Sequence, residues 1–137
     1  MRSSSDTELR ERVYKKTDGK CFYCGRGLIL NGFQRKDRMT IDHLIPRSKG
    51  GNGYFHNLVP CCKRCNRIKN DTKELEQFRF ELTMDHFQKK FHVRFTQKHI
   101  YFLRDVIKIK LPIKYFIFHF ENHENLKKMA EPLLNVD

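Results

Sequence analysis

The stretch Cys62-Lys63-Arg64-Cys65 decides much of the fold, because it repeats the cysteine spacing of Cys21-Phe22-Tyr23-Cys24. Each pair can wrap one side of an ion through a tight turn, and four thiolates then close a tetrahedral zinc site. A closed site leaves no coordination position for a substrate, so the predicted zinc is structural. In so short a chain it would add folding free energy that a small core cannot supply. Buried free thiols or a redox pair are the alternative interpretations.

The fifth cysteine, Cys61, has no place in this pattern. Cys61 and Cys62 cannot both keep a two-residue spacing to Cys65, so Cys62 is chosen as the ligand and Cys61 is interpreted as a small buried side chain. No apolar leader follows Met1, which predicts that no secretory signal is present. Cysteines outside an oxidising compartment are metal ligands or reduced thiols, and the expected location is cytoplasmic.

Charge and length restrict the partners. The 137 residues include 28 Lys and Arg against 16 Asp and Glu, a formal net charge of +12. So large a charge implies an anionic partner, with nucleic acid first and an anionic membrane surface second. With 39% apolar and 12% aromatic residues the chain can still bury a core. The densest apolar stretch, Tyr115–Phe118, is far shorter than the roughly 20 residues of a spanning helix, so a transmembrane protein is excluded. Nucleic acid, and no membrane, is the expected partner.

Local patterns outline a first domain, expected over residues 1–72. Apolar residues at helical spacing predict a first helix, and β-branched residues before Pro46 predict a strand. The expected elements are a helix over 6–18, a strand over 39–45, a loop over 46–56, an extended piece over 57–60 and a helix starting at 66–69. Together they predict an α+β fold.

Residues 73–137 are expected to form a mixed or helical C-terminal extension packed on that core. The predicted elements are a helix carrying Leu75, Phe78 and Leu82, a helix over 99–107, a strand over 115–120 and a helix over 121–130. Short apolar runs do not separate helix from strand by periodicity. Phe78, Phe87, Phe91 and Phe95 are interpreted as core residues, with base stacking as the alternative.

Between the two cysteine pairs, and directly after the second, lie residues suited to phosphodiester hydrolysis. Asp42 and His43 stand at the end of the predicted strand, and Asn57 and Asn66 follow in a basic segment. Oxygen ligands such as Asp42 and Asn66 suit a Mg²⁺-like ion. An imidazole such as that of His43 has a pKa near neutrality, as a base that activates water requires.

This order of motifs resembles the HNH endonucleases, also called ββα-metal nucleases. The resemblance covers about residues 12–72 and rests on the zinc cysteines, Asp42-His43 with the following Pro46–Gly51, Asn57-Leu58-Val59, and Cys62–Lys69. It implies a ββα-metal core stapled by a structural zinc. It also implies hydrolysis of DNA by a one-metal mechanism, as nicking or double-strand cleavage.

The resemblance also implies a role for each residue. Asp42 would bind the catalytic ion, His43 would be the general base, Asn57 would hold the loop that bears the histidine, and Asn66 would be the second ligand. An asparagine stands where the family is named for a histidine, which favours oxygen-ligated Mg²⁺ or Mn²⁺ over Zn²⁺ or Ni²⁺. Restriction, homing, phage packaging and defence enzymes all use this core.

Basic residues surround the expected site and would contact phosphates on both sides of the scissile bond. They are Arg47, Lys49, Lys63, Arg64, Arg67 and Lys69. One such site cuts one strand, so double-strand cleavage would need either a homodimer or two successive nicks.

Two rival functions remain open. A non-catalytic zinc-finger module that binds nucleic acid would use the charge and the cysteines equally well, but it does not require Asp42, His43 and Asn66 together. A redox or other zinc enzyme would use Cys61 and would show a reactive thiol in the zinc-loaded protein.

Overall fold

The computed structural model describes residues 4–32, 36–70, 74–102 and 116–134. The chain divides into two compact units, one made of Met1–Thr72 with Phe118–Asp137 and the other of Lys73–Ile117. The division expected from sequence assigns everything after residue 72 to one extension, whereas here Phe118–Asp137 groups with the first unit. Among the described helices, none combines the length and apolar content needed to cross a membrane.

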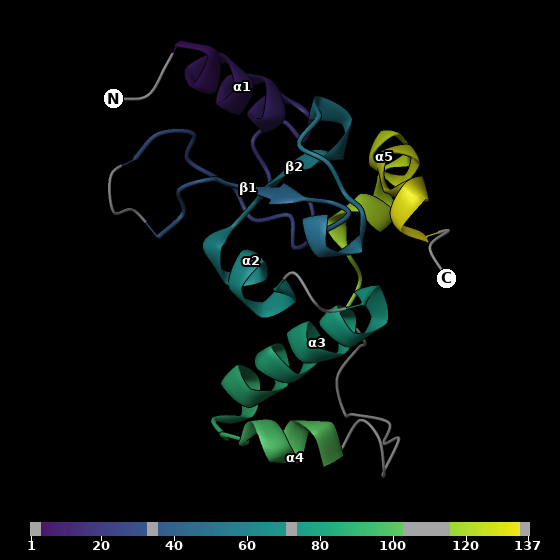
Figure 1. The fold of residues 1–137 in the computed structure, drawn as a ribbon. Coiled ribbons are helices and arrows are strands. Elements are labelled where there is room, and N and C mark those ends of the chain that lie inside the picture. The colour runs from purple at the N-terminus through teal and green to yellow at the C-terminus, as the bar shows by residue number, and fades with distance from the viewer. Residues whose placement is uncertain (1–3, 33–35, 71–73, 103–115, 135–137) are drawn as a thin grey trace. The chain divides into compact units, whose positions relative to one another are not determined.

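The centre of the first unit is a two-stranded antiparallel sheet. Strand β1 (Thr40–His43) pairs with β2 (Leu58–Cys61), and the two lie side by side in Figure 1. Both strands lie close to the predicted segments, since their β-branched and apolar residues suit a pleated, half-buried surface. The connection contains two short 3₁₀ helices, η1 (Arg47–Lys49) and η2 (Phe55–Asn57).

Helix α2 (Lys63–Lys69) follows β2 and contacts β1, which completes a strand–strand–helix unit. It begins earlier than predicted because Cys62 caps it. The Cys62 Sγ accepts a hydrogen bond from the backbone N of Cys65 at 3.3 Å, so a free amide of the first turn is satisfied. The predicted α+β class with a ββα-metal core is confirmed.

The first unit is closed by α1 (Ser4–Lys15) and by the end of the chain. Helix α1 contacts β2. The 3₁₀ helix η4 (His119–Asn122) and helix α5 (Glu124–Leu134) bring two phenylalanines to the cysteine turn. The ring of Phe120 stacks on that of Phe22 at 4.9 Å, and Phe118 meets Tyr23 edge-on at 6.0 Å.

The second unit is helical where it is described. Helix α3 (Leu75–Phe91) confirms the helix expected around Leu75 and Leu82, and α4 (Gln97–Phe102) covers the start of the next one. The rest of that predicted helix lies outside the described residues. The strand predicted over 115–120 is wrong for its described part, because 116–118 have no regular structure and η4 begins at His119.

Candidate functional site

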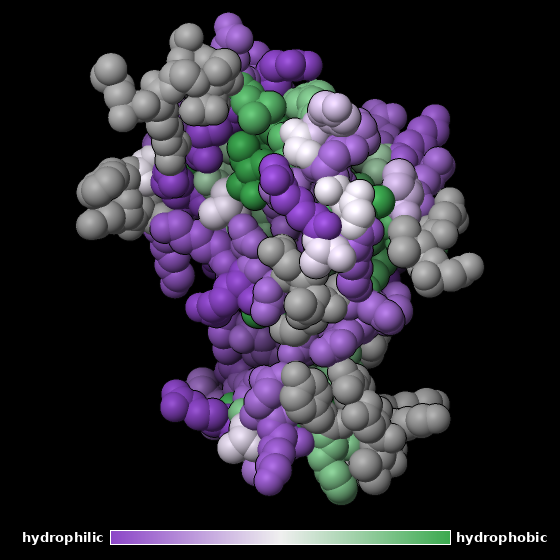
Figure 2. All heavy atoms as spheres, viewed as in Figure 1, coloured by the Kyte–Doolittle hydropathy of each residue, from purple (hydrophilic) through white to green (hydrophobic). Residues whose placement is uncertain are grey.

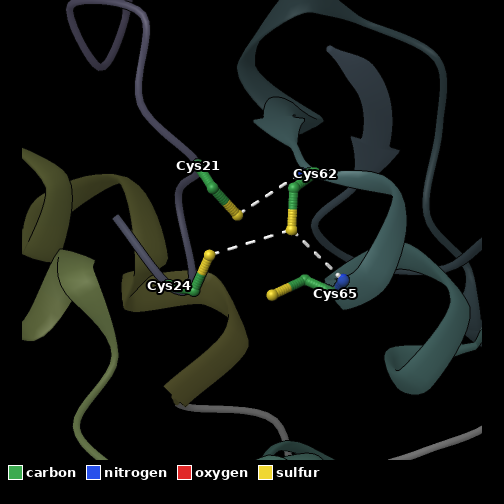
Figure 3. A group of neighbouring side chains, drawn as sticks. All are labelled: Cys21, Cys24, Cys62 and Cys65. Carbon is green, nitrogen blue, oxygen red and sulfur yellow. Dashed lines mark hydrogen bonds between the residues drawn. The ribbon is translucent and has the colours of Figure 1, made fainter. Parts of the chain in front are cut away.

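The four predicted zinc ligands come together. Cys21 and Cys24 lie in the turn after α1, and Cys62 and Cys65 lie at the start of α2, with all four sulfurs pointing toward one centre (Figure 3). The ligand atoms lie within 4.8 Å of one another, and the Sγ atoms of Cys24 and Cys62 are 3.7 Å apart. A tetrahedral zinc with sulfurs at about 2.3 Å spaces them by about 3.8 Å. The cysteines are therefore placed to bind a metal ion such as zinc.

Hydrogen bonds within the cluster change the pKa values of its thiols. A hydrogen bond with Cys21 holds the pKa of Cys24 well below its usual range, while the bond with Cys24 raises the pKa of Cys21 to about 12. Hydrogen bonds with Cys21 also raise the pKa values of Cys62 and Cys65. Without a cation the cluster therefore favours one thiolate, and the four thiolates of a metal site require the ion's charge.

Cys61 is not one of the four clustered cysteines, as the sequence pattern suggests, although its thiol interacts with that of Cys21. It is fully buried, and its thiol donates to the backbone O of Cys62 at 3.3 Å. Burial raises its pKa, so the thiol stays protonated. A protonated, buried thiol is a poor nucleophile, which weighs against a redox function for Cys61.

Asp42, the third residue of β1, is buried. Its Oδ2 accepts a hydrogen bond from the Tyr23 hydroxyl at 2.6 Å and lies 3.1 Å from the Lys69 Nζ. Burial, followed by the charge of Asp42, raises the pKa of Tyr23 well above its ordinary value, so the phenol remains a donor. In the described part of the chain, nothing hydrogen-bonds Oδ1, which stays an available oxygen ligand.

Asn66 lies against the same strand as Asp42. Its Nδ2 donates to the Oγ1 of Thr40 at 3.0 Å, and Lys69, three residues later on α2, meets Asp42. Residues two apart on a strand share a face, and residues three apart on a helix are neighbours. Helix α2 thus brings Asn66 and Lys69 to the β1 face that carries Thr40 and Asp42. No described residue bonds the Asn66 side-chain oxygen.

His43 is the last residue of β1 and is half-buried. Its backbone O lies 3.4 Å from the Lys69 Nζ, and its register partner is Leu58. Among the described residues none hydrogen-bonds the imidazole, whose ring nitrogens can therefore meet a water or a phosphate.

Asn57 holds the loop that follows His43. Its Oδ1 accepts from the backbone N of Ile45 at 2.8 Å, and its Nδ2 donates to the backbone O of Ile45 at 3.0 Å and of Asn52 at 2.7 Å. The side chain is 5% exposed. All these bonds go to loop backbone, which is the geometry that a residue holding the loop requires.

The six basic residues expected near the site differ in exposure. Arg47, Lys49, Lys63 and Arg67 are exposed, and Arg64 is half-buried. Lys69 differs from the expectation, because its side chain is only 5% exposed and its ammonium pairs with Asp42. That position suits neutralisation of the Asp42 carboxylate better than a phosphate contact. Hydrophilic residues also predominate on the face of the molecule drawn in Figure 2.

The sequence alone did not indicate two residues that support the site, Tyr23 and Lys16. Lys16 would pass for a solubilising residue, yet its Nζ donates to the backbone O of Phe55 at 2.5 Å and of Leu58 at 2.6 Å, on either side of Asn57. Tyr23 had one available signal: a tyrosine between two predicted metal ligands is expected to be buried and then needs a partner for its hydroxyl. Lys16 had none, because its partners are backbone atoms about 40 residues away.

The site and fold define a class. Residues 21–72 match the family model described as HNH endonuclease, so this part of the chain is an HNH endonuclease domain. The resemblance found from the motifs is thereby confirmed.

Two known proteins contain regions similar to this chain. The CRISPR-associated endonuclease Cas9 of Actinomyces naeslundii is 38% identical over 53 residues, which are 38% of this chain and 4% of that protein. The crystal structure of the Type II-C Cas9 enzyme from the same organism matches 99% of this chain and 13% of its own chain, with 21% identity and a TM-score of 0.50. The structural match shows the fold. The chain spans only a small part of both relatives.

Proposed function

We propose that this chain is a metal-dependent endonuclease that hydrolyses phosphodiester bonds in DNA. The observation that carries the proposal is the meeting of α2 with β1. It brings Asp42 and Asn66, each with a side-chain oxygen unbonded by the described residues, to the strand that ends at His43.

The residues present fit a hard divalent ion. One carboxylate oxygen and one amide oxygen are the donors that Mg²⁺ and Mn²⁺ accept, and two protein ligands leave positions for water and phosphate. An ion held by Asp42 and Asn66 would polarise the phosphoryl oxygen and stabilise the leaving 3′ oxygen.

The residues of the chain carry the remaining tasks. His43 takes a proton from the attacking water, and its free imidazole nitrogens suit this role. Asn57 holds the backbone of Ile45 and so sets the direction in which the chain leaves His43. The products would carry 5′-phosphate and 3′-hydroxyl ends.

The four-cysteine site is proposed to hold a structural zinc, and the exposed basic side chains to hold DNA. Arg47 and Lys49 lie in η1, which follows the end of β1, and Lys63 and Arg67 are one turn apart on α2. Phosphate contacts of this kind give salt-dependent binding with little sequence preference. Cleavage of both strands would proceed by a homodimer or by two successive nicks.

A plasmid assay tests the proposal. Zinc-loaded protein is incubated with supercoiled DNA with and without added Mg²⁺, and nicked product is measured. His43→Ala should lower the rate by at least about 10²-fold, because a general base contributes on that order. DNA binding in a gel shift and the zinc content should be unchanged.

His86→Ala is the matched control, because His86 is an exposed histidine of α3 outside the site. It should cut at the parental rate. Metal-independent nicking, or equal cutting by His43→Ala, would overturn the assignment. DNA binding without any cleavage would favour a non-catalytic zinc-finger module.

A further inference from the structure

Two donors, the Tyr23 hydroxyl and the Lys69 ammonium, contact the Asp42 carboxylate, and both contact the same oxygen. The Tyr23 hydroxyl lies 2.6 Å from Oδ2 and the Lys69 ammonium 3.1 Å from it. Tyr23 is fully buried, and the side chains of Asp42 and Lys69 are 4% and 5% exposed. A half-turn of the carboxylate about its Cβ–Cγ bond would exchange Oδ1 for Oδ2 but could not provide a second inward oxygen. One of the two carboxylate oxygens is therefore always bonded to Tyr23 and Lys69 in the interior.

Tyr23 is itself held on both its backbone and its ring. Its backbone O accepts a hydrogen bond from the N of His119 at 2.7 Å. Its ring meets the rings of Phe22, Phe118 and Phe120 edge-on at 5.3, 6.0 and 6.3 Å. The residues on either side of the pair Phe22-Tyr23 are the metal-site cysteines Cys21 and Cys24. These contacts fix the Tyr23 side chain, so its hydroxyl is held in one position.

The two donors contribute differently. Lys69 supplies the positive charge that a buried carboxylate needs, since an unpaired buried charge costs several kcal/mol. Tyr23 brings no charge, so it neither neutralises Asp42 nor repels a second cation. What the phenol adds is direction, because a hydrogen bond weakens steeply away from its preferred angle.

We propose that Tyr23 is a positioning residue for the divalent ion, holding Asp42 by Oδ2 so that Oδ1 alone is offered as a ligand. This inference rests on the proposed function, in which Asp42 binds the ion. A single carboxylate oxygen suits Mg²⁺, which demands near-octahedral geometry and keeps several waters. Residues that hold a metal ligand from behind typically change metal affinity by about 10–100-fold when removed.

The test compares two tyrosine hydroxyls in the zinc-loaded full chain. Tyr23→Phe removes the hydroxyl that bonds Asp42, and Tyr14→Phe removes one that bonds only the backbone O of Leu28, at 3.1 Å. Mn²⁺ affinity is measured without DNA by electron paramagnetic resonance, and nicking is measured against Mn²⁺ concentration. Tyr23→Phe should weaken Mn²⁺ binding about tenfold or more, with the nicking rate recovering at high Mn²⁺. Tyr14→Phe should bind Mn²⁺ like the parent.

The variant Asp42→Asn distinguishes a failure of the proposed ion site from a failure of the proposed role of Tyr23. If Asp42→Asn binds Mn²⁺ as well as the parent does, or if the parent binds none, the proposed ion site is wrong and the inference about Tyr23 is wrong too. If it does bind such an ion and Tyr23→Phe binds it equally well, the inference alone is wrong.

A measurement on the parent protein covers the case in which Tyr23→Phe loses its zinc or its fold. The Tyr23 hydroxyl proton, protected by burial, is followed by NMR as Mg²⁺ is added. It should remain protected when the ion is bound. Its loss on Mg²⁺ binding would mean that Asp42 leaves Tyr23 to take the ion, which would overturn the proposal.

Discussion

Gly51 shows how closely single residues shape the loop that follows His43. A Cβ added at Gly51 would stand 1.7 Å from the backbone O of Ile45. Hydrogen bonds hold the same part of the loop. The Gly51 N donates to the O of Pro46 at 2.9 Å, and the side-chain amide of Asn57 makes hydrogen bonds with the backbone of Ile45. The close approach leaves room for hydrogen alone.

Gly51→Ala should therefore displace this loop. The clash is with backbone, which cannot swing aside as a side chain can, so a cost of about 1–3 kcal/mol is expected, with a loss of nicking. Gly27→Ala is the control, because no atom lies within 4 Å of its added Cβ. Chemical denaturation of both variants measures the difference. Equal stability of the two would contradict the close approach.

Lys16 links protonation to the stability of the same region. Burial, then the charge of Arg12, lowers the Lys16 pKa from 10.5 to about 8. Between these two values the unfolded chain binds more protons than the folded one, so this residue makes the free energy of unfolding rise with pH across that window. Below about pH 8 the folded ammonium donates to two backbone carbonyls and lies over the Phe55 ring at 4.0 Å.

Lys16→Met tests both statements while keeping the apolar stem. Loss of two charged hydrogen bonds should lower the unfolding free energy by about 1–3 kcal/mol at pH 7. The difference in unfolding free energy between parent and variant should widen from pH 8 to pH 10, as urea denaturation at several pH values would measure. Lys15→Met, at an exposed neighbour, should show neither effect. A pH-independent difference would contradict the lowered pKa.

At the scale of elements, the cysteine turns join the β1–β2 hairpin to helix α2. The Cys62 N donates to the Cys21 Sγ at 3.4 Å and the Cys65 N donates to the Cys62 Sγ at 3.3 Å, so the ligands also organise backbone. An ion here would hold the turn after α1, the end of β2 and the start of α2 in one arrangement.

Loss of the metal should unfold the first unit. Structural zinc in small domains contributes about 10–16 kcal/mol, which matches or exceeds the ~5–15 kcal/mol net stability of a typical domain. Cys65→Ser should lose zinc and helical circular dichroism, whereas Cys61→Ser should keep one zinc per chain, since Cys61 lies outside the cluster. Metal analysis with circular dichroism checks both. A folded, zinc-free Cys65→Ser protein would refute a structural role.

Local signals explain which elements the sequence could predict. Strand β1 follows from β-branched residues before Pro46, and β2 covers most of the predicted extended piece. The sequence predicts α2 only from residues 66–69, because the cap that starts it earlier, Cys62, is not one of the usual capping residues. The segment 116–120 could not be read correctly, because an apolar run carries no period that separates a strand from a turn packed on an aromatic cluster.

The same limit applies to the site. Asp42, His43, Asn57 and Asn66 could be proposed because their order and spacing form a motif. The Tyr23–Asp42 and Lys16–Leu58 bonds join residues far apart in sequence, and only the folded chain brings them together.

At the scale of the whole molecule, the end of the chain supplies part of the core of the first unit. Phe118, Phe120, Leu126 and Ala130 are all buried, and the Phe120 N donates to the O of Phe22 at 3.2 Å. Burying each large apolar side chain contributes about 1.5–3 kcal/mol, so the three largest amount to roughly 5–9 kcal/mol. That is comparable to the whole net stability of a small domain.

Two shortened forms of this chain should therefore behave in opposite ways. Residues 1–72 alone contain every motif of the HNH domain but lack the buried C-terminal side chains, so they should be unfolded or aggregated even with zinc. A variant in which a long Gly/Ser linker replaces residues 74–116 keeps those side chains and should fold, bind one zinc and unfold cooperatively. Thermal unfolding followed by circular dichroism distinguishes them. A stable, zinc-loaded 1–72 fragment would show that the hairpin and its helix need no support from residues 118–134.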